Sequence, residues 1–135
     1  MADTGKPSLD HTLLCDDIRQ ELGGKFSLMG IFETISASAF PAMHPRFVIV
    51  NEWTGGKGEF TLTVRLLTPD RSTAIAESSS TMSLHGETQR HRDVVIRLNT
   101  TFTSPGTYWL EMRIDDRVAG MVPLPVLHIS PHHVH

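Results

Sequence analysis

Apolar and polar residues alternate with a period of two over several short stretches of the chain. The pattern is clearest in residues 59–67, and residues 94–98 and 108–114 repeat it. Because successive side chains of a strand point to opposite faces, each stretch is predicted to be a strand with one buried face. The apolar residues expected to face the core are Phe60, Leu62, Val64, Leu66, Val94, Ile96, Leu98, Tyr108, Leu110, Met112 and Ile114. In the second of these strands, Arg97 and Asn99 are expected to face outward.

Three further stretches differ from this simple alternation. Residues 46–53 are apolar at nearly every position, which is typical of a central strand, whereas residues 73–80 are more polar, as in an edge strand. Pro123 and Pro125 stand two residues apart in the last apolar stretch. Their missing N–H groups point to the same side, so this stretch is predicted to be an edge strand with its outer side blocked.

Turn residues separate these stretches at roughly ten-residue intervals. Pro105-Gly106 precedes one predicted strand, and Asp115-Asp116 reverses the chain after it, since aspartate tolerates the positive φ of a tight hairpin. The pattern predicts an all-β fold: a mostly antiparallel, immunoglobulin-like β-sandwich of seven to eight strands, with a jelly roll as the alternative. Residues 11–129 are predicted to form one domain between a flexible leader, 1–10, and a His-bearing tail, 130–135.

The segment 16–35 allows two interpretations. Residues 17–20 resemble a helix capping box, and Gly23 could end such a helix. Alternatively, Gly23-Gly24 is a hairpin turn that joins strands at 13–22 and 25–35. A longer loop, such as residues 21–24, would avoid placing Glu21 opposite Phe26. A helix of about one and a half turns is marginal by itself, so the hairpin is favoured.

The composition of the chain indicates in which compartment the protein is found and which classes of partner it does not bind. The 135 residues suit one domain, and the single cysteine, Cys15, excludes an intrachain disulfide, as in proteins of reducing compartments. The first residues lack the apolar core of a secretory signal, and apolar runs are too short to span a membrane, so a cytoplasmic location is expected. The net charge is −3 with charges interspersed, so neither nucleic-acid nor membrane binding is expected.

Catalytic motifs are not found in the sequence. It contains no Gly-x-Ser-x-Gly, no His-Glu-x-x-His and no phosphate-binding glycine loop. Asp16 and Asp17 would raise the pKa of the adjacent Cys15 thiol, which shares a strand face with Leu13 and is expected to be buried. We therefore predict a protein that is not an enzyme and needs no cofactor.

The histidines suggest an alternative hypothesis for the function. His85 and His91 flank a polar loop where, with Glu87, they could form a small-molecule or metal site. Four more histidines gather near the C-terminus, but Pro131 interrupts that segment, so no metal site is predicted there. The histidines of this second group are His128, His132, His133 and His135.

A candidate binding surface lies on the strand of residues 108–114. Trp109, Glu111 and Arg113 alternate with its apolar residues and so share the opposite face. Trp109 could be exposed on that face, where an aromatic ring suits a protein partner or a sugar, or it could lie under a neighbouring loop. Trp53 ends the central strand and is expected in the core.

The sequence also resembles a known family. Cys15-Asp16-Asp17, then Gly24-Lys25, Gly30-Ile31-Phe32 and finally Pro105-Gly106-Thr107-Tyr108 are similar to motifs of a family of small, uncharacterised bacterial proteins. The resemblance covers most of residues 13–127, and it implies a single all-β domain with the hairpin at 16–35. It implies no activity, cofactor or catalytic residue.

Together these patterns predict a non-catalytic cytoplasmic interaction module that binds a protein partner or itself, with a homodimer possible. The alternative is a domain that binds a small molecule, carbohydrate or metal through the loop histidines or Trp109.

Overall fold

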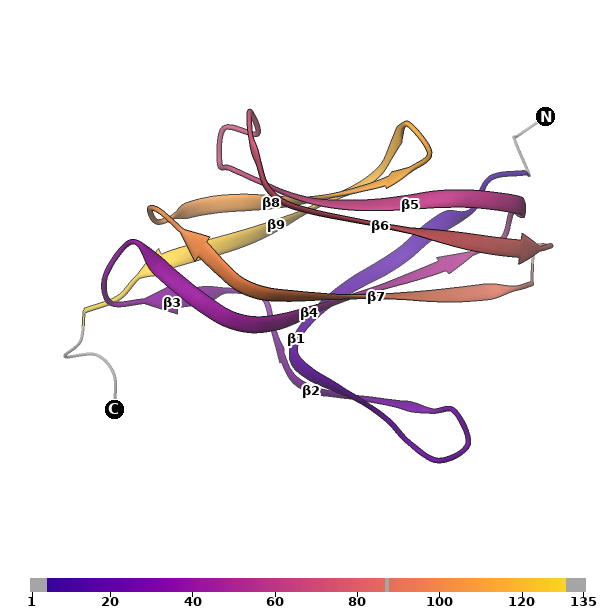
Figure 1. Ribbon diagram of the computed structural model, residues 1–135, viewed down its shortest axis with the longest axis horizontal. Helices are drawn as coiled ribbons and strands as arrows, with labels where there is room; N and C mark the ends of the chain where they lie inside the picture. Colours follow the sequence, from indigo (N-terminus) through magenta and orange to yellow (C-terminus); the bar gives the residue numbers. More distant parts are fainter. Residues whose placement is uncertain (1–4, 87, 131–135) are drawn as a thin grey trace.

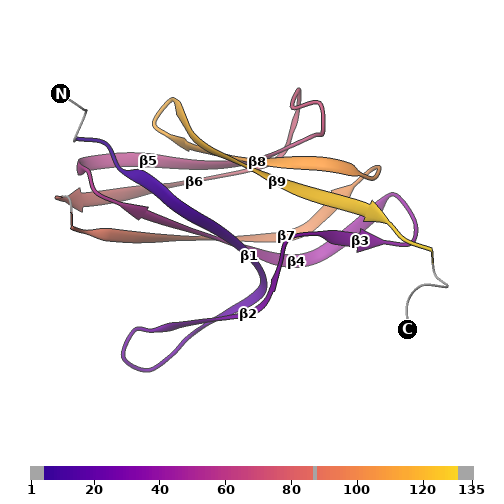
Figure 2. The same cartoon turned by 180° about the vertical axis from the view of Figure 1, so that it is seen from behind.

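The computed structural model describes residues 5–86 and 88–130, which form strands and connecting loops without a helix (Figures 1 and 2). These residues accordingly contain no helical segment that could cross a membrane. The strands are β1 (Ser8–Gln20), β2 (Phe26–Phe32), β3 (Ile35–Ala37), β4 (Ala42–Thr54), β5 (Lys57–Leu67), β6 (Ala74–His85), β7 (Arg90–Phe102), β8 (Gly106–Ile114) and β9 (Arg117–His128). The all-β prediction is confirmed, although the described residues form nine strands rather than seven or eight. Because β1 begins at Ser8, its first three residues lie within the segment predicted as a leader.

The strands form two sheets that face each other (Figure 1). One sheet has four strands in the order β2-β1-β4-β7, and the other has five in the order β3-β9-β8-β5-β6. All pairs are antiparallel except β3 with β9, which is parallel. Residues 126–128 of β9 pair with β3, so β9 is an edge only over its earlier part, which includes Pro123 and Pro125.

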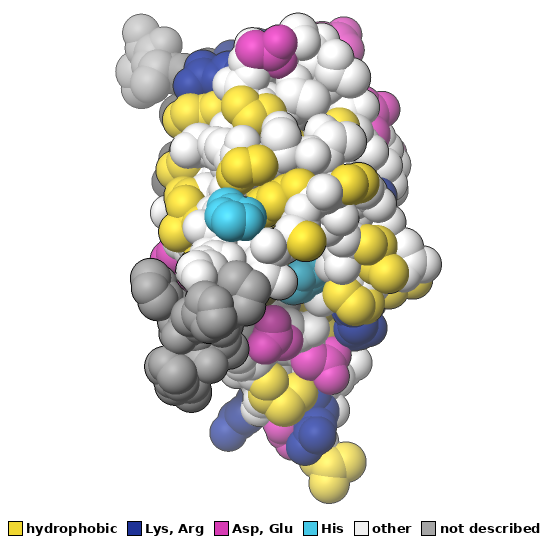
Figure 3. Space-filling view, turned by 90° about the vertical axis from the view of Figure 1, so that its left-hand side faces the viewer, with side chains coloured by type: hydrophobic (Ala, Val, Ile, Leu, Met, Phe, Trp, Pro, Cys, Tyr) yellow, Lys and Arg dark blue, Asp and Glu magenta, His cyan; other side chains and the backbone are white. Residues whose placement is uncertain are grey.

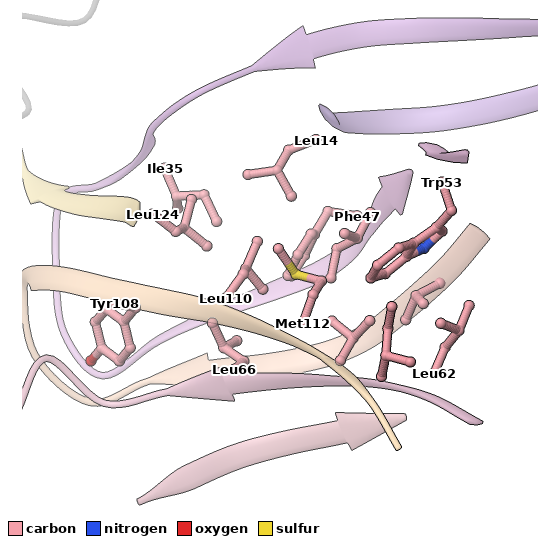
Figure 4. Packing of buried hydrophobic residues seen from close by; sticks show 14 of the residues in the cluster. Leu14, Ile35, Phe47, Trp53, Leu62, Leu66, Tyr108, Leu110, Met112 and Leu124 are labelled. Carbon is pink, nitrogen blue, oxygen red and sulfur yellow. The ribbon is translucent and has the colours of Figure 1, made fainter. Parts of the chain in front are cut away.

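The main core lies between the two sheets (Figure 4). Phe47 and Trp53 enter it from β4, and Leu110 and Met112 from β8. Trp53 is buried there, as predicted. At one end the Tyr108 ring packs edge-on against Phe102, and the Tyr108 hydroxyl donates a hydrogen bond of 2.8 Å to the Ser104 carbonyl.

Strand β4 is buried on both faces, which explains its nearly continuous apolar sequence. Val48 and Val50 point away from the main core and form a second cluster with Cys15. Cys15 is buried, as predicted, and this burial raises the pKa of its thiol. Ile18 and Leu28 cover this cluster.

The covering residues belong to a hairpin, residues 16–32, which we call the arm. The hairpin prediction is therefore confirmed over the helix, and β1 and β2 pair from Leu14 opposite Phe32 to Gln20 opposite Phe26. The arm projects from the body on the outer side of the four-stranded sheet (Figures 1 and 3). Gly30 has a φ of +71°, and a Cβ there would meet the Asp16 carboxylate, so glycine allows the bend at the base of the arm.

The tight turn between β8 and β9 follows the prediction from sequence. Asp115 adopts a φ of +52°. Its N–H donates to the Thr61 carbonyl at 2.7 Å, and its carboxylate accepts the Thr61 N–H at 3.0 Å. This aspartate thus ties the turn to the neighbouring strand β5.

Candidate interaction surface on strand β7

Strand β7 lies at the edge of the four-stranded sheet, and its two faces are the reverse of those predicted. Ile96 and Leu98 are 46% and 59% exposed, whereas Asp93 is only 7% exposed. Val95 lies in the main core, opposite Ile49 of β4. The prediction that Val94, Ile96 and Leu98 face the main core is therefore wrong. The polar residues Asp93 and Arg97 lie on the inward face of β7 instead.

Hydroxyl groups on β6 make this reversal possible. Ser80 Oγ donates to the Asp93 carboxylate at 3.2 Å, and Arg97 Nη1 donates to Ser78 Oγ at 2.7 Å. We call these four residues the seam, because they join the edge of one sheet to the edge of the other. A cleft of about 190 Å³ lies here, between the serines of β6 and residues 93–96 of β7. Inward polar groups are tolerated where such hydrogen bonds replace water.

Asp93 is electrostatically strained in this position. Its burial raises the pKa of the carboxyl group, and the Ser80 hydroxyl and nearby His91 offset this only in part. Asn51 lies opposite Asp93 on β4, and its side-chain carbonyl accepts a 2.5 Å hydrogen bond from Thr12. The seam therefore continues inward as a polar row within an otherwise apolar layer.

The outer side of β7 adjoins the arm. Arg92 pairs with Glu52 at 3.0 and 3.1 Å, and its guanidinium lies 5.1 Å from the centre of the Phe26 ring of the arm. Val94 packs against the second cluster beneath the arm. Beyond it, the apolar side chains at positions 96 and 98 remain exposed to solvent.

The position of β7 at the edge of its sheet leaves one side of its backbone available for pairing. Among the described residues β7 pairs with β4 alone, so the other side of its thirteen-residue backbone has no strand beside it. It contains no proline, and its register with β4 is unbroken from residue 42 to residue 54. A long edge of this kind with apolar side chains is a template for pairing with another chain.

Comparison with known proteins places the chain in a family. Residues 10–127 match the model of a family of unknown function, DUF6941. The chain belongs to DUF6941. None of the curated proteins matches it. The prediction of an uncharacterised family is confirmed by this match.

The surface predicted around Trp109 is differently organised in this DUF6941 chain. Arg71, at a φ of +63°, places its guanidinium 4.0 Å from the centre of the Trp109 ring. The ring is half-buried and Arg71 lies over one of its faces, so a neighbouring loop covers part of it. Asp70 shapes this loop by accepting hydrogen bonds from Thr68 and Ser72, which lower the pKa of its carboxyl group to about 2.

The neighbouring charges on this face are paired with one another. Glu111 is buried and accepts hydrogen bonds from Arg113 Nε at 2.7 Å and from Arg65 Nη1 at 3.0 Å. These two arginines, Arg113 first, lower the pKa of Glu111. Arg65 also pairs with Glu77 at 3.1 Å. Glu111 and Arg113 therefore form an ion pair with each other on the face of the sheet.

The structure places the loop histidines on different strands of the DUF6941 fold. His85 is exposed at the end of β6, where its backbone N–H donates to Gln89 Oε1 at 2.7 Å, and His91 is half-buried on β7 opposite Trp53. Within residues 5–86 and 88–130, no three His, Cys, Asp or Glu side chains gather as metal ligands would. Glu87 and the histidines of residues 131–135 lie outside the described residues.

Asp93 gives a test of the seam through its protonation. Its pKa is raised above the usual 3.8, so the folded state holds the proton more tightly than the unfolded state does. This contribution to stability is complete below the unfolded pKa and is lost as the pH rises through the folded one. In dilute solution, where copies of the chain are separate, Asp93→Asn is therefore expected to raise the free energy of unfolding at pH 7 by about 1 kcal/mol or less, and the gain is expected to disappear near pH 4.

Urea unfolding of both proteins at the two pH values measures this effect. Asp70→Asn is the control with the opposite sign, because the pKa of Asp70 is lowered and its charged form is the stabilised one. That variant is expected to be less stable than wild type at pH 7. A loss of stability in Asp93→Asn at pH 7 would contradict the account of the seam.

Proposed function

We propose that this chain is a non-catalytic interaction module that binds an extended segment of a protein chain along β7. The observation that carries the proposal is the orientation of the two faces of β7. Its apolar side chains Ile96 and Leu98 face solvent, while its polar side chains Asp93 and Arg97 point inward and bond to the serines of β6. Strand addition would pair the open backbone of β7 and cover Ile96 and Leu98 at the same time. Main-chain hydrogen bonds would supply affinity, and the alternate side chains would supply selectivity.

We further propose that the two sheets form an immunoglobulin-like sandwich. The strand order supports this: leaving β2 and β3 aside, β1, β4 and β7 lie in one sheet and β9, β8, β5 and β6 in the other. Tyr108 supports it too, because its hydroxyl binds the backbone four residues earlier at the corner before β8, as the tyrosine corner of such folds does. The lone buried Cys15 is compatible with the proposed cytoplasmic location.

A displayed library of random ten-residue peptides tests the proposed function without choosing a partner. We expect enriched peptides to alternate apolar and polar residues and to bind wild type. Ile96→Lys is expected to abolish their binding, because a lysine on an edge strand opposes strand addition. Ile75→Lys is the matched control, since it places the same charge at an exposed isoleucine of the other edge, β6.

Two results would refute strand addition on β7. One is a library that yields no binding peptides. The other is equal loss of peptide binding in the Ile96→Lys and Ile75→Lys variants, both checked for native folding by circular dichroism.

A further inference from the structure

We infer that the extended segment bound by β7 is β7 of a second copy of this chain, paired antiparallel about a two-fold axis at Val95. This inference rests on the proposed function and names its partner. It follows from the spacing of charged and apolar residues along β7, taken together with the face on which the structure places each.

The two faces of β7 restrict the possible registers. Directly opposed residues of an antiparallel pair share a face of the sheet. If the axis fell between two residues, each outward side chain would meet an inward one of the other copy. The axis therefore passes through a residue, and Val94, Val95 and Ile96 are the central choices.

Charge selects among these three. An axis at Val95 sets Asp93 of each copy opposite Arg97 of the other, which gives two opposite-charge pairs on the inner face. An axis at Val94 sets Asp93 opposite Val95, and an axis at Ile96 sets Arg97 opposite Val95. Only the first register gives both the buried Asp93 and the half-buried Arg97 an oppositely charged neighbour.

Both charged groups have hydrogen-bonding capacity to offer. Arg97 uses Nη1 on Ser78, but its Nε is buried and has no hydrogen-bond partner among the described residues. Asp93 accepts one bond from Ser80 and is largely removed from water. A guanidinium from the second copy would supply donors to this carboxylate, and the carboxylate would accept from the orphan Nε.

The outer face of the same register covers the exposed apolar groups. Val94 of each copy would lie opposite Ile96 of the other, and Arg92 opposite Leu98. Because the Arg92 guanidinium lies over the Phe26 ring, Leu98 of one copy would also come beside the arm of the other. The register thus brings together exposed hydrophobic side chains that are separate in one copy.

Cysteine pairs test the register directly. Opposed residues have Cα atoms about 4.5–5.5 Å apart, within the range of a disulfide. We expect a mixture of Val94→Cys and Ile96→Cys proteins to form a disulfide-linked heterodimer under mild oxidation. Each variant alone is expected to remain uncrosslinked, because its two cysteines would be offset by two residues. Wild type is the control for Cys15, which is buried.

Light scattering tests the pairing without cysteines. We expect a mass of twice 15.0 kDa for wild type at high concentration. Arg97→Glu is expected to raise the dimer dissociation constant about tenfold or more, because each Asp93 would then face a like charge.

Different failures have different meanings. Crosslinking of Val94→Cys or Ile96→Cys with itself would overturn the axis at Val95 while leaving strand addition standing. A wild-type mass of 15.0 kDa at every concentration, without crosslinks, would overturn the second copy as partner. The peptide library would still decide the proposed function independently.

Discussion

Phe47→Ala is expected to lower the free energy of unfolding by about 3–5 kcal/mol. Phe47 is fully buried in the main core. Its ring packs edge-on against the rings of His44 and Phe32, with centroids 5.6 and 6.3 Å away. Alanine would remove these contacts and leave a cavity that the flanking strands cannot close, because both sheets are fixed by their hydrogen-bonded ladders.

Urea unfolding followed by tryptophan fluorescence measures the loss. Leu98→Ala is the matched control: it also truncates an apolar side chain on the four-stranded sheet, but at an exposed position. Its expected change is within about 0.5 kcal/mol. Similar losses in the two variants would contradict the assignment of Phe47 to the core and Leu98 to the surface.

Gly30→Ala is expected to destabilise the fold by about 2–4 kcal/mol and to release the arm. An alanine would have to adopt a φ of +71° while its Cβ met the Asp16 carboxylate. Asp16 is exposed and its carboxylate can turn away, but the Asp16 Cβ would still lie 3.1 Å from the new methyl group. Relieving that contact requires the two strands to separate at the bend, which would lift Leu28 and Ile18 from the second cluster. Cys15, which is buried and whose thiol pKa is raised by that burial, would become accessible to a thiol reagent.

The rate at which a thiol reagent labels Cys15 reports this release, beside urea unfolding for the stability. Gly23→Ala is the matched control, since Gly23 at the tip of the arm has a φ of +84° but no atom near its Cβ position. It is expected to lose about 1–2 kcal/mol without faster labelling. Equal losses and an unreactive Cys15 in both variants would show that the bend does not hold the arm.

Local patterns predicted the elements that depend on neighbouring residues. Alternation and turn residues located most strands, the glycine pair located the arm, and the apolar run at 46–53 identified β4 as central. Asp115 was predicted from the φ that its turn requires. These features depend on interactions within a few positions of the chain, so the sequence carries them directly.

The orientation of β7 could not be predicted in this way. The alternation of residues along a strand shows which residues share a face, but the packing of the whole sheet determines which face is buried. Here Ser78 and Ser80, on a different strand, satisfy the inward Arg97 and Asp93. The signal available was the run of serines in 78–80, since the hydroxyl groups of alternate serines in a strand share a face and can bond polar residues opposite them.

The sequence left open whether Trp109 is exposed or lies under a loop for a related reason. The residues of the predicted surface were correctly placed on one face of β8, but their partners come from elsewhere in the chain. Arg71 comes from a loop and Arg65 from β5. Neither contact can be predicted from the alternation of residues 108–114.

The parallel pairing of β3 with β9 has a consequence for how the protein is made. Ile35 is synthesised early, but the strand that receives it ends at His128. Strands β1, β4 and β7 can pair once residue 102 has been added, whereas the five-stranded sheet is complete only when β9 has been made. A growing chain would therefore leave core residues of the four-stranded sheet uncovered until β9 is synthesised, and folding should be slow for a fold of this size.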